Sequence, residues 1–134
     1  SRISGPLFDR IDLFIDVPAL KIEDMVGEST GETTAQIAAR VHKARQVQLE
    51  RFKKDNQKYK TNAEVDGQYL EQTAVLDADG KKLLMQAVDN FKISMRGYNR
   101  ILRVSRTIAD LAGCEAISKQ HVAESIAYRQ RVYK

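Results

Sequence analysis

The chain of 134 residues contains a single cysteine and no long apolar stretch. Cys114 has no second cysteine to pair with, so the chain forms no internal disulfide, which agrees with a reducing cytoplasm. No apolar run approaches the ~18 residues that a transmembrane helix needs, and no signal peptide opens the chain. We therefore expect a cytoplasmic protein with no membrane partner.

The sequence also lacks the motifs of a self-contained enzyme. It contains no Gly-x-x-x-x-Gly-Lys-(Ser/Thr) phosphate loop, no Gly-x-Ser-x-Gly nucleophile motif and no paired-carboxylate pattern. His42 and His121 fall on different expected helices, and we interpret each as a surface or cap residue rather than a metal ligand. We therefore expect no metal site, and no catalysis by this chain alone.

Charge is distributed unevenly along the chain, whose formal net charge is +4. Residues 37–60 carry eight basic and two acidic side chains, and residues 94–134 carry eight basic and three acidic ones. The segments that precede each of them are net acidic. Such basic segments indicate either a polyanionic partner or an ordinary solvated helix face. In residues 37–60 the lack of aromatic interleaving favours the solvated face over direct contact with nucleic acid.

Most of what the sequence does contain indicates helices. The strongest signal spans residues 94–113, where Ser94 is a good N-cap and Gly113 is a good residue to follow the C-terminus. Between them an apolar stripe recurs at three- and four-residue steps, formed by Met95, Tyr98, Ile101, Leu102, Ser105, Ile108, Ala109 and Ala112. This pattern predicts a helix that packs one side against a core.

The same helix carries a separate basic face. At about 100° per residue, Arg96, Arg100 and Arg103 lie within roughly 60° of one another. A helix that packs on one side and presents several guanidinium groups from another is suited to an anion. Phosphate is the obvious candidate, because arginine offers planar, bidentate and permanently charged contacts.

Further helices are expected on both sides of this one. Thr33 or Thr34 can cap a long helix that ends near Asn56, with a semi-apolar face formed by Ile37, Val41, Ala44, Gln48 and Phe52. Shorter helices are expected from about Gln68, Asp77 and Ser118. The predicted fold class is therefore all-α, a helical bundle with a long preceding helix.

The beginning of the chain has a different pattern. Residues 11–17 alternate between apolar and polar side chains and are stopped by Pro18, which predicts a β-strand, yet no second strand follows. We interpret residues 1–17 as the last strand region of a larger core, residues 18–33 as a linker and residues 34–134 as the helical domain. Without its sheet, the segment 1–32 is expected to be flexible or to pair with the edge of a neighbouring sheet.

Two motifs resemble a known family. Residues 4–13, Ser-Gly-Pro-Leu-Phe-Asp-Arg-Ile-Asp-Leu, and residues 103–112, Arg-Val-Ser-Arg-Thr-Ile-Ala-Asp-Leu-Ala, are similar to the C-terminal part of the magnesium-chelatase-like AAA+ ATPases. The similarity is closer to the YifB/ComM branch than to the true chelatase subunit. It also extends over Gly27-Glu-Ser-Thr, the helix around residues 45–52 and the closing helix at residues 117–129. The resemblance implies that the strand closes an ATPase core and that the helices form the lid over its nucleotide.

The resemblance also implies roles for particular arginines. Arg10 corresponds to the arginine finger that reaches the γ-phosphate bound by a neighbouring subunit. Arg96 corresponds to the sensor-2 arginine of the lid, which contacts the phosphates of its own or an adjacent site. Arg100 and Arg103 are further candidates for binding the nucleotide. The alternatives are a structural ion pair of Arg10 with Asp9 or Asp12, and an exposed first-turn residue for Arg96. Arg106 can pair with Asp110 at i+4.

For the full protein, the resemblance implies a ring-forming ATPase, a hexamer, that uses ATP and Mg²⁺. Its partners would be the upstream AAA+ core and the neighbouring subunits, with DNA as the substrate in competence and recombination. The fragment alone is expected to be inactive and to hold no nucleotide. Two alternatives remain, namely the lid of the ATPase subunit of a magnesium chelatase, and a free-standing basic helical module that binds nucleic acid or protein.

Overall fold

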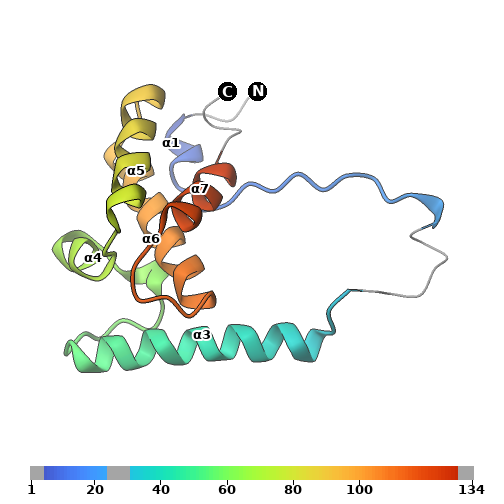
Figure 1. The fold of residues 1–134 in the computed structure, drawn as a ribbon, viewed down its shortest axis with the longest axis horizontal. Coiled ribbons are helices and arrows are strands. Elements are labelled where there is room, and N and C mark those ends of the chain that lie inside the picture. The colour runs from blue at the N-terminus through green and yellow to red at the C-terminus, as the bar shows by residue number, and fades with distance from the viewer. Residues whose placement is uncertain (1–4, 24–30, 130–134) are drawn as a thin grey trace.

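The computed structural model describes residues 5–23 and 31–129, and these residues form the helical bundle that the sequence predicts (Figure 1). In chain order the elements are α1 (Gly5–Phe8), α3 (Thr34–Lys54), the 3₁₀ helix η1 (Asn62–Glu64), α4 (Gly67–Thr73), α5 (Ala78–Phe91), α6 (Met95–Leu111) and α7 (Lys119–Ala127). Within these ranges no strand forms, and the only β-type pairing is a single parallel bridge between Leu76 and Ile117. The all-α class is therefore confirmed.

Helix α6 lies at the centre of the bundle, where it contacts α7, α3, η1 and α4, and α5 packs against α7 (Figure 1). Its predicted stripe is buried where it meets these helices, at Ile101, Leu102 and Ala109, whereas Met95 at the beginning of the helix is largely exposed. The core is completed by residues from all the surrounding elements, namely Phe52, Val65, Leu70, Ala74, Leu84, Ile117 and Val122.

The predicted ends of α6 and α3 are confirmed. Ser94 caps α6 by accepting a hydrogen bond from the Gly97 amide at 3.1 Å, and Gly113 follows the helix with a φ of 73°, which a residue without a Cβ adopts easily. Thr33 caps α3 and forms a reciprocal capping box with Gln36. These residues mark the helix ends through contacts with residues only a few positions away, which is why the sequence alone could predict them.

The semi-apolar face of α3 packs along only half of its length. Ala44, Gln48 and Phe52 are buried against α6 and η1, whereas Ile37 and Val41 remain 44% and 40% exposed. Figure 1 shows the N-terminal half of α3 extending beyond the other helices. The periodicity predicted which face of α3 is apolar, but it could not show how far along the helix that face is buried.

The predicted strand at residues 11–17 does not form. The residues before it make the short helix α1, and residues 11–21 have no regular secondary structure. A strand needs a neighbouring edge for its backbone hydrogen bonds, and this segment is bonded in other ways. The Phe14 amide donates to the Tyr128 carbonyl oxygen at 2.8 Å, and the Ile11 carbonyl oxygen accepts from Arg129 Nη1 at 2.5 Å. Residues 5–14 therefore lie against the bundle, contrary to the expectation of a loose segment; residues 1–4 and 24–30 lie outside the described part.

A buried polar network joins α6 to α3 and to the loops beside it. Asp110 is buried and pairs with Arg106 at 3.1 Å, as the i+4 spacing predicts, and it also binds Arg51 and accepts from Asn62 Nδ2 at 2.9 Å. Arg106 donates in addition to three backbone carbonyl oxygens, of Thr73, Cys114 and Glu115. Burial lowers the pKa of Arg106, and the Asp110 carboxylate opposes that shift. The network fixes the C-terminal half of α6.

Candidate anion-binding site

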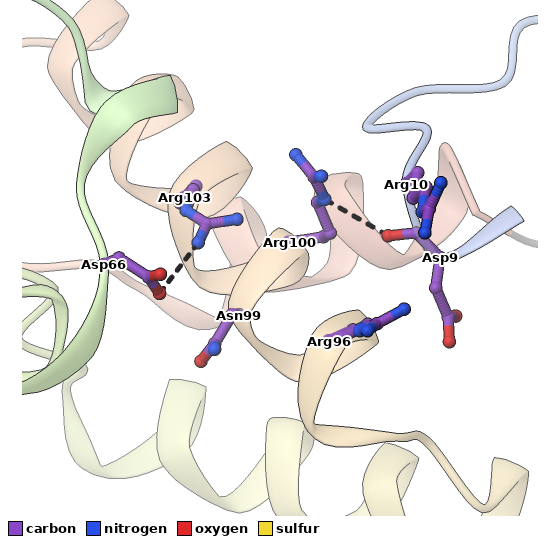
Figure 2. Close-up of a pocket in the computed structure, with 7 residues that line it drawn as sticks. All are labelled: Asp9, Arg10, Asp66, Arg96, Asn99, Arg100 and Arg103. Atoms are coloured by element: carbon purple, nitrogen blue, oxygen red, sulfur yellow. Dashed lines mark hydrogen bonds and ion pairs between the residues drawn. The ribbon is translucent and has the colours of Figure 1, made fainter. Parts of the chain in front are cut away.

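One pocket of about 400 Å³ brings together all four arginines that the sequence indicates as candidates (Figure 2). Helix α6 supplies Arg96, Asn99, Arg100 and Arg103. Steps of three or four residues separate Arg96 and Arg103 from the adjacent pair Asn99 and Arg100, so all four lie toward one side of the helix. The remaining lining residues come from two other places in the chain, the turn after α1 and the residue before α4, and are Asp9, Arg10 and Asp66.

Two of the four arginines are bound to the pocket wall. Arg100 donates through Nε to the Asp9 carbonyl oxygen at 3.1 Å and through Nη1 to Asp12 Oδ1 at 2.7 Å. Arg103 donates through Nε to the Val65 carbonyl oxygen at 2.6 Å and through Nη2 to Asp66 Oδ1 at 3.0 Å. These contacts attach the turn after α1 and the segment before α4 to neighbouring positions on the same helical face.

The other two arginines have no such partner. Within the described residues, neither the Arg10 nor the Arg96 guanidinium makes a hydrogen bond or an ion pair, and both residues are exposed. The structure therefore lacks the alternative ion pair of Arg10, because Asp9 and Asp12 are bound by other side chains. Figure 2 shows Arg96 extended toward the side of the pocket where Asp9 and Arg10 lie. Two uncompensated guanidinium groups facing one hollow suit a multiply charged oxyanion.

Asp9 fixes the turn that carries Arg10 against the beginning of α6. The Ser94 hydroxyl donates to Asp9 Oδ2 at 2.9 Å while it caps the helix, so the carboxylate lies at the positive end of the helix dipole. A Cβ on Gly97 would be tight only against Ile93 Cγ2, at 3.1 Å, whereas Asp9 Oδ1 at 3.7 Å would lie in ordinary van der Waals contact. The contact between Asp9 and Ser94 places Arg10 and Arg96 at the same end of the pocket.

Arg129 completes the support of this turn, and no sequence motif predicted its role. Its side chain is fully buried although it follows the last turn of α7. It donates to the carbonyl oxygens of Phe8 and Ile11, lies 3.8 Å from Asp9 Oδ1 and covers the ring of Phe14 at 6.0 Å. Its backbone acceptors are well over 100 positions away in the chain, so no local motif could reveal them.

His121 lies at the beginning of α7. His121 is a cap residue, as interpreted from the sequence, because its Nδ1 accepts from the Ser118 amide at 3.0 Å at the beginning of α7. In the described part of the chain, no helix combines the length and the apolar character needed to cross a membrane.

The helical fold and the arginine-lined pocket define a small α-domain with a basic pocket on α6. Comparison with known families makes the assignment specific, since the sequence model described as "Magnesium chelatase, subunit ChlI C-terminal" matches residues 31–129, and the chain belongs to this family.

Individual relatives agree with this assignment. The chain is 39% identical over 133 residues to the competence protein ComM of Haemophilus influenzae, an alignment that covers 98% of this chain and 25% of that protein. It is 34% identical over 131 residues to the uncharacterised protein YifB of Salmonella typhimurium, covering 96% of this chain and 24% of YifB. The chain thus spans about a quarter of the length of the curated relatives it matches. The resemblance to the YifB/ComM branch is confirmed.

Proposed function

We propose that this chain is the C-terminal lid of an AAA+ ATPase and that Arg10 and Arg96 contact the phosphates of its ATP. The observation that supports the proposal most strongly is the convergence of these two unpaired guanidinium groups, from distant parts of the chain, on one pocket. Guanidinium groups stabilise the charge that spreads over the oxygens of a transferred phosphoryl group, and an arginine finger contributes about 10³–10⁵ in rate.

The shared pocket also constrains the arrangement of subunits. If Arg10 is an arginine finger, it reaches a nucleotide held by a neighbouring subunit, and Arg96 beside it faces that same triphosphate. The nucleotide and its Mg²⁺ would be held by core elements outside this chain, whose sequence contains no phosphate loop. A nucleotide held by one subunit and contacted by Arg10 and Arg96 of the next would make hydrolysis depend on a ring. Each hydrolysis step would also change the contacts of the lid.

Arg100 and Arg103 have a different place in this proposal. Each uses its Nε and one terminal nitrogen to hold the pocket wall, which leaves the other terminal nitrogen, Nη2 of Arg100 and Nη1 of Arg103, without a hydrogen bond among the described residues. We propose that they shape the pocket first and add weaker contacts to the nucleotide through the nitrogens that remain.

The test substitutes Arg10→Ala and Arg96→Ala in the full-length protein. The Arg10 variant should lose about 10³-fold or more in kcat with an unchanged ring, and the Arg96 variant should lose at least about 10²-fold. Lys81→Ala, an exposed change on α5, serves as the control. Mixing the Arg10 variant with subunits whose phosphate loop is inactivated should restore part of the activity, since complete sites then form between unlike subunits. Normal hydrolysis by the Arg10 and Arg96 variants would disprove the proposal.

DNA is the substrate that we propose for the complete ring, and the name of the relative ComM, a competence protein, supports this choice. The expected result is stimulation of ATP hydrolysis by DNA. The family description supports the alternative, a chelatase lid that serves metal insertion into a porphyrin. Stimulation by porphyrin and Mg²⁺, with no response to DNA, would favour that alternative.

A further inference from the structure

The turn that carries Arg10 is held on both sides of that residue by one side chain. Arg129 donates through Nη1 to the Ile11 carbonyl oxygen at 2.5 Å and through Nη2 to the Phe8 carbonyl oxygen at 3.3 Å. Arg129 is fully buried, whereas Arg10 is exposed. We propose that Arg129 is the positioning residue for Arg10, so that the last turn of the lid sets where the finger points. This inference rests on the function proposed above.

The turn depends on outside support because it cannot hold itself. Helix α1 has four residues, too few to be stable alone, and residues 11–14 have no strand partner. The Arg10 side chain makes no hydrogen bond within the described residues that could fix it from its own end. Its position is therefore set by the backbone of the turn, which Arg100 and Ser94 hold at Asp9 and which Arg129 holds on both sides of Arg10.

The chemistry of Arg129 suits this task better than general packing would. A buried cation is unfavourable unless hydrogen bonds and opposite charge compensate it, and here the finger turn supplies both, through two carbonyl oxygens and the Asp9 carboxylate at 3.8 Å. The planar fork fixes the separation of the two carbonyl groups, and the ring of Phe14 lies against its face. Arg129 does not line the pocket, so it acts through Arg10 and not on the ligand.

The test uses Arg129→Lys and Arg129→Met in the full-length protein. Lysine keeps the charge but has one nitrogen for two carbonyl groups, and methionine keeps most of the volume without either donor. Both should lower kcat for ATP hydrolysis by at least about tenfold and change KM for ATP by less than about twofold, because a displaced finger weakens the transition state more than substrate binding. The matched control is Lys119→Met, which removes an exposed cation from α7, the helix that precedes Arg129, and should leave kcat unchanged.

A double-mutant cycle separates positioning from a role in folding. In an Arg10→Ala background, measured by single-turnover hydrolysis, the Arg129 substitutions should cause no further loss, because the side chain they position is absent. Equal losses in both backgrounds would overturn the inference and assign Arg129 to folding alone. If the Arg129→Met variant is insoluble, the double-mutant cycle is measured with Arg129→Lys alone. Normal kcat in both Arg129 variants would also overturn the inference.

Failure of the inference can be told apart from failure of the proposed function. If Arg10→Ala abolishes hydrolysis and the Arg129 variants hydrolyse normally, only the positioning role fails. If Arg10→Ala hydrolyses ATP at the normal rate, the finger assignment fails and the positioning role fails with it. Hydrogen exchange at the Phe14 amide gives a second readout, which should be at least about tenfold faster in Arg129→Met while the α6 amides are unaffected. Equal acceleration in α6 would overturn the inference.

Discussion

Arginines of the same helix have different roles because their surroundings differ. On α6, Arg96 is exposed and unpaired in the described part of the chain, Arg100 and Arg103 are held at the pocket wall, and Arg106 is buried among carbonyl groups. The sequence spacing predicted the face that Arg96, Arg100 and Arg103 share. It could not predict which guanidinium groups find a partner, because those partners come from residues 9–12 and 65–66.

Tyr69 provides a prediction about pH. Its hydroxyl donates to Asp55 Oδ2 at 2.8 Å, and burial, together with that hydrogen bond and the charge of Asp55, raises its pKa from 10.0 to about 12. The unfolded chain therefore loses this proton before the folded chain does. The stability that Tyr69 contributes is complete below pH 10 and is lost as the pH rises toward 12.

Urea unfolding of the native chain and of Tyr69→Phe across this window checks that prediction. The difference in free energy of unfolding between them should be constant below pH 10 and should shift against the native chain between pH 10 and 12. The difference in tyrosinate absorbance between the native chain and Tyr69→Phe should show one tyrosine that ionises above pH 10. A difference that stays constant through the whole window would contradict the assigned contacts.

At the scale of elements, the order and type of the helices followed from the sequence because caps and apolar periodicity are local signals. Ser94, Thr33 and Gly113 mark helix ends in the structure as they do in the sequence. The segment at residues 11–17 was predicted wrongly, because its alternation suits a strand whose partner edge is not among the described residues. Periodicity shows which face is apolar, and only the tertiary structure shows whether that face is covered.

Asp110 shows how strongly separate elements depend on one another. This buried carboxylate joins α6 to Arg51 of α3 and to Asn62 of η1, and it also compensates the buried Arg106. Asp110→Ala should lower the free energy of unfolding by about 3–5 kcal/mol, because it leaves buried guanidinium and amide groups without their acceptor. Urea unfolding of the chain measures this loss. The control is Asp89→Ala, an exposed position on α5, with an expected change in the free energy of unfolding within about 0.5 kcal/mol. A loss below about 1 kcal/mol for Asp110→Ala would contradict the importance of the network.

At the scale of the whole molecule, some residues of the basic and acidic segments of the sequence form ion pairs with one another. The basic C-terminal segment pairs with acidic residues of the segments that precede it, through Arg100–Asp12, Arg103–Asp66 and Arg129–Asp9. Uneven charge along the chain therefore reflects internal pairing in part, and it is weaker support for a polyanionic partner than the sequence suggested. Pairs separated by 37 or more positions could not be inferred from local spacing.

Binding of DNA by this chain alone should accordingly be weak. We expect a dissociation constant near or above about 10⁻⁴ M at physiological salt, at the weak end of nonspecific binding. Fluorescence anisotropy with a labelled duplex measures it, with Lys43→Glu and Lys54→Glu, both exposed on α3, as comparison variants. Binding tighter than about 10⁻⁶ M that these variants abolish would instead favour the free-standing basic module.

The contact between Arg129 and the turn after α1 has a consequence for synthesis. Ile11 and Arg129 are 118 positions apart, so a ribosome releases the proposed finger long before it adds the residue that fastens it. A subunit ended early by a premature stop codon before Arg129 would carry Arg10 on unfastened backbone. Arg10 would then reach its working position only after translation is complete. In the proposed ring, a truncated subunit would leave the nucleotide of its neighbour unhydrolysed.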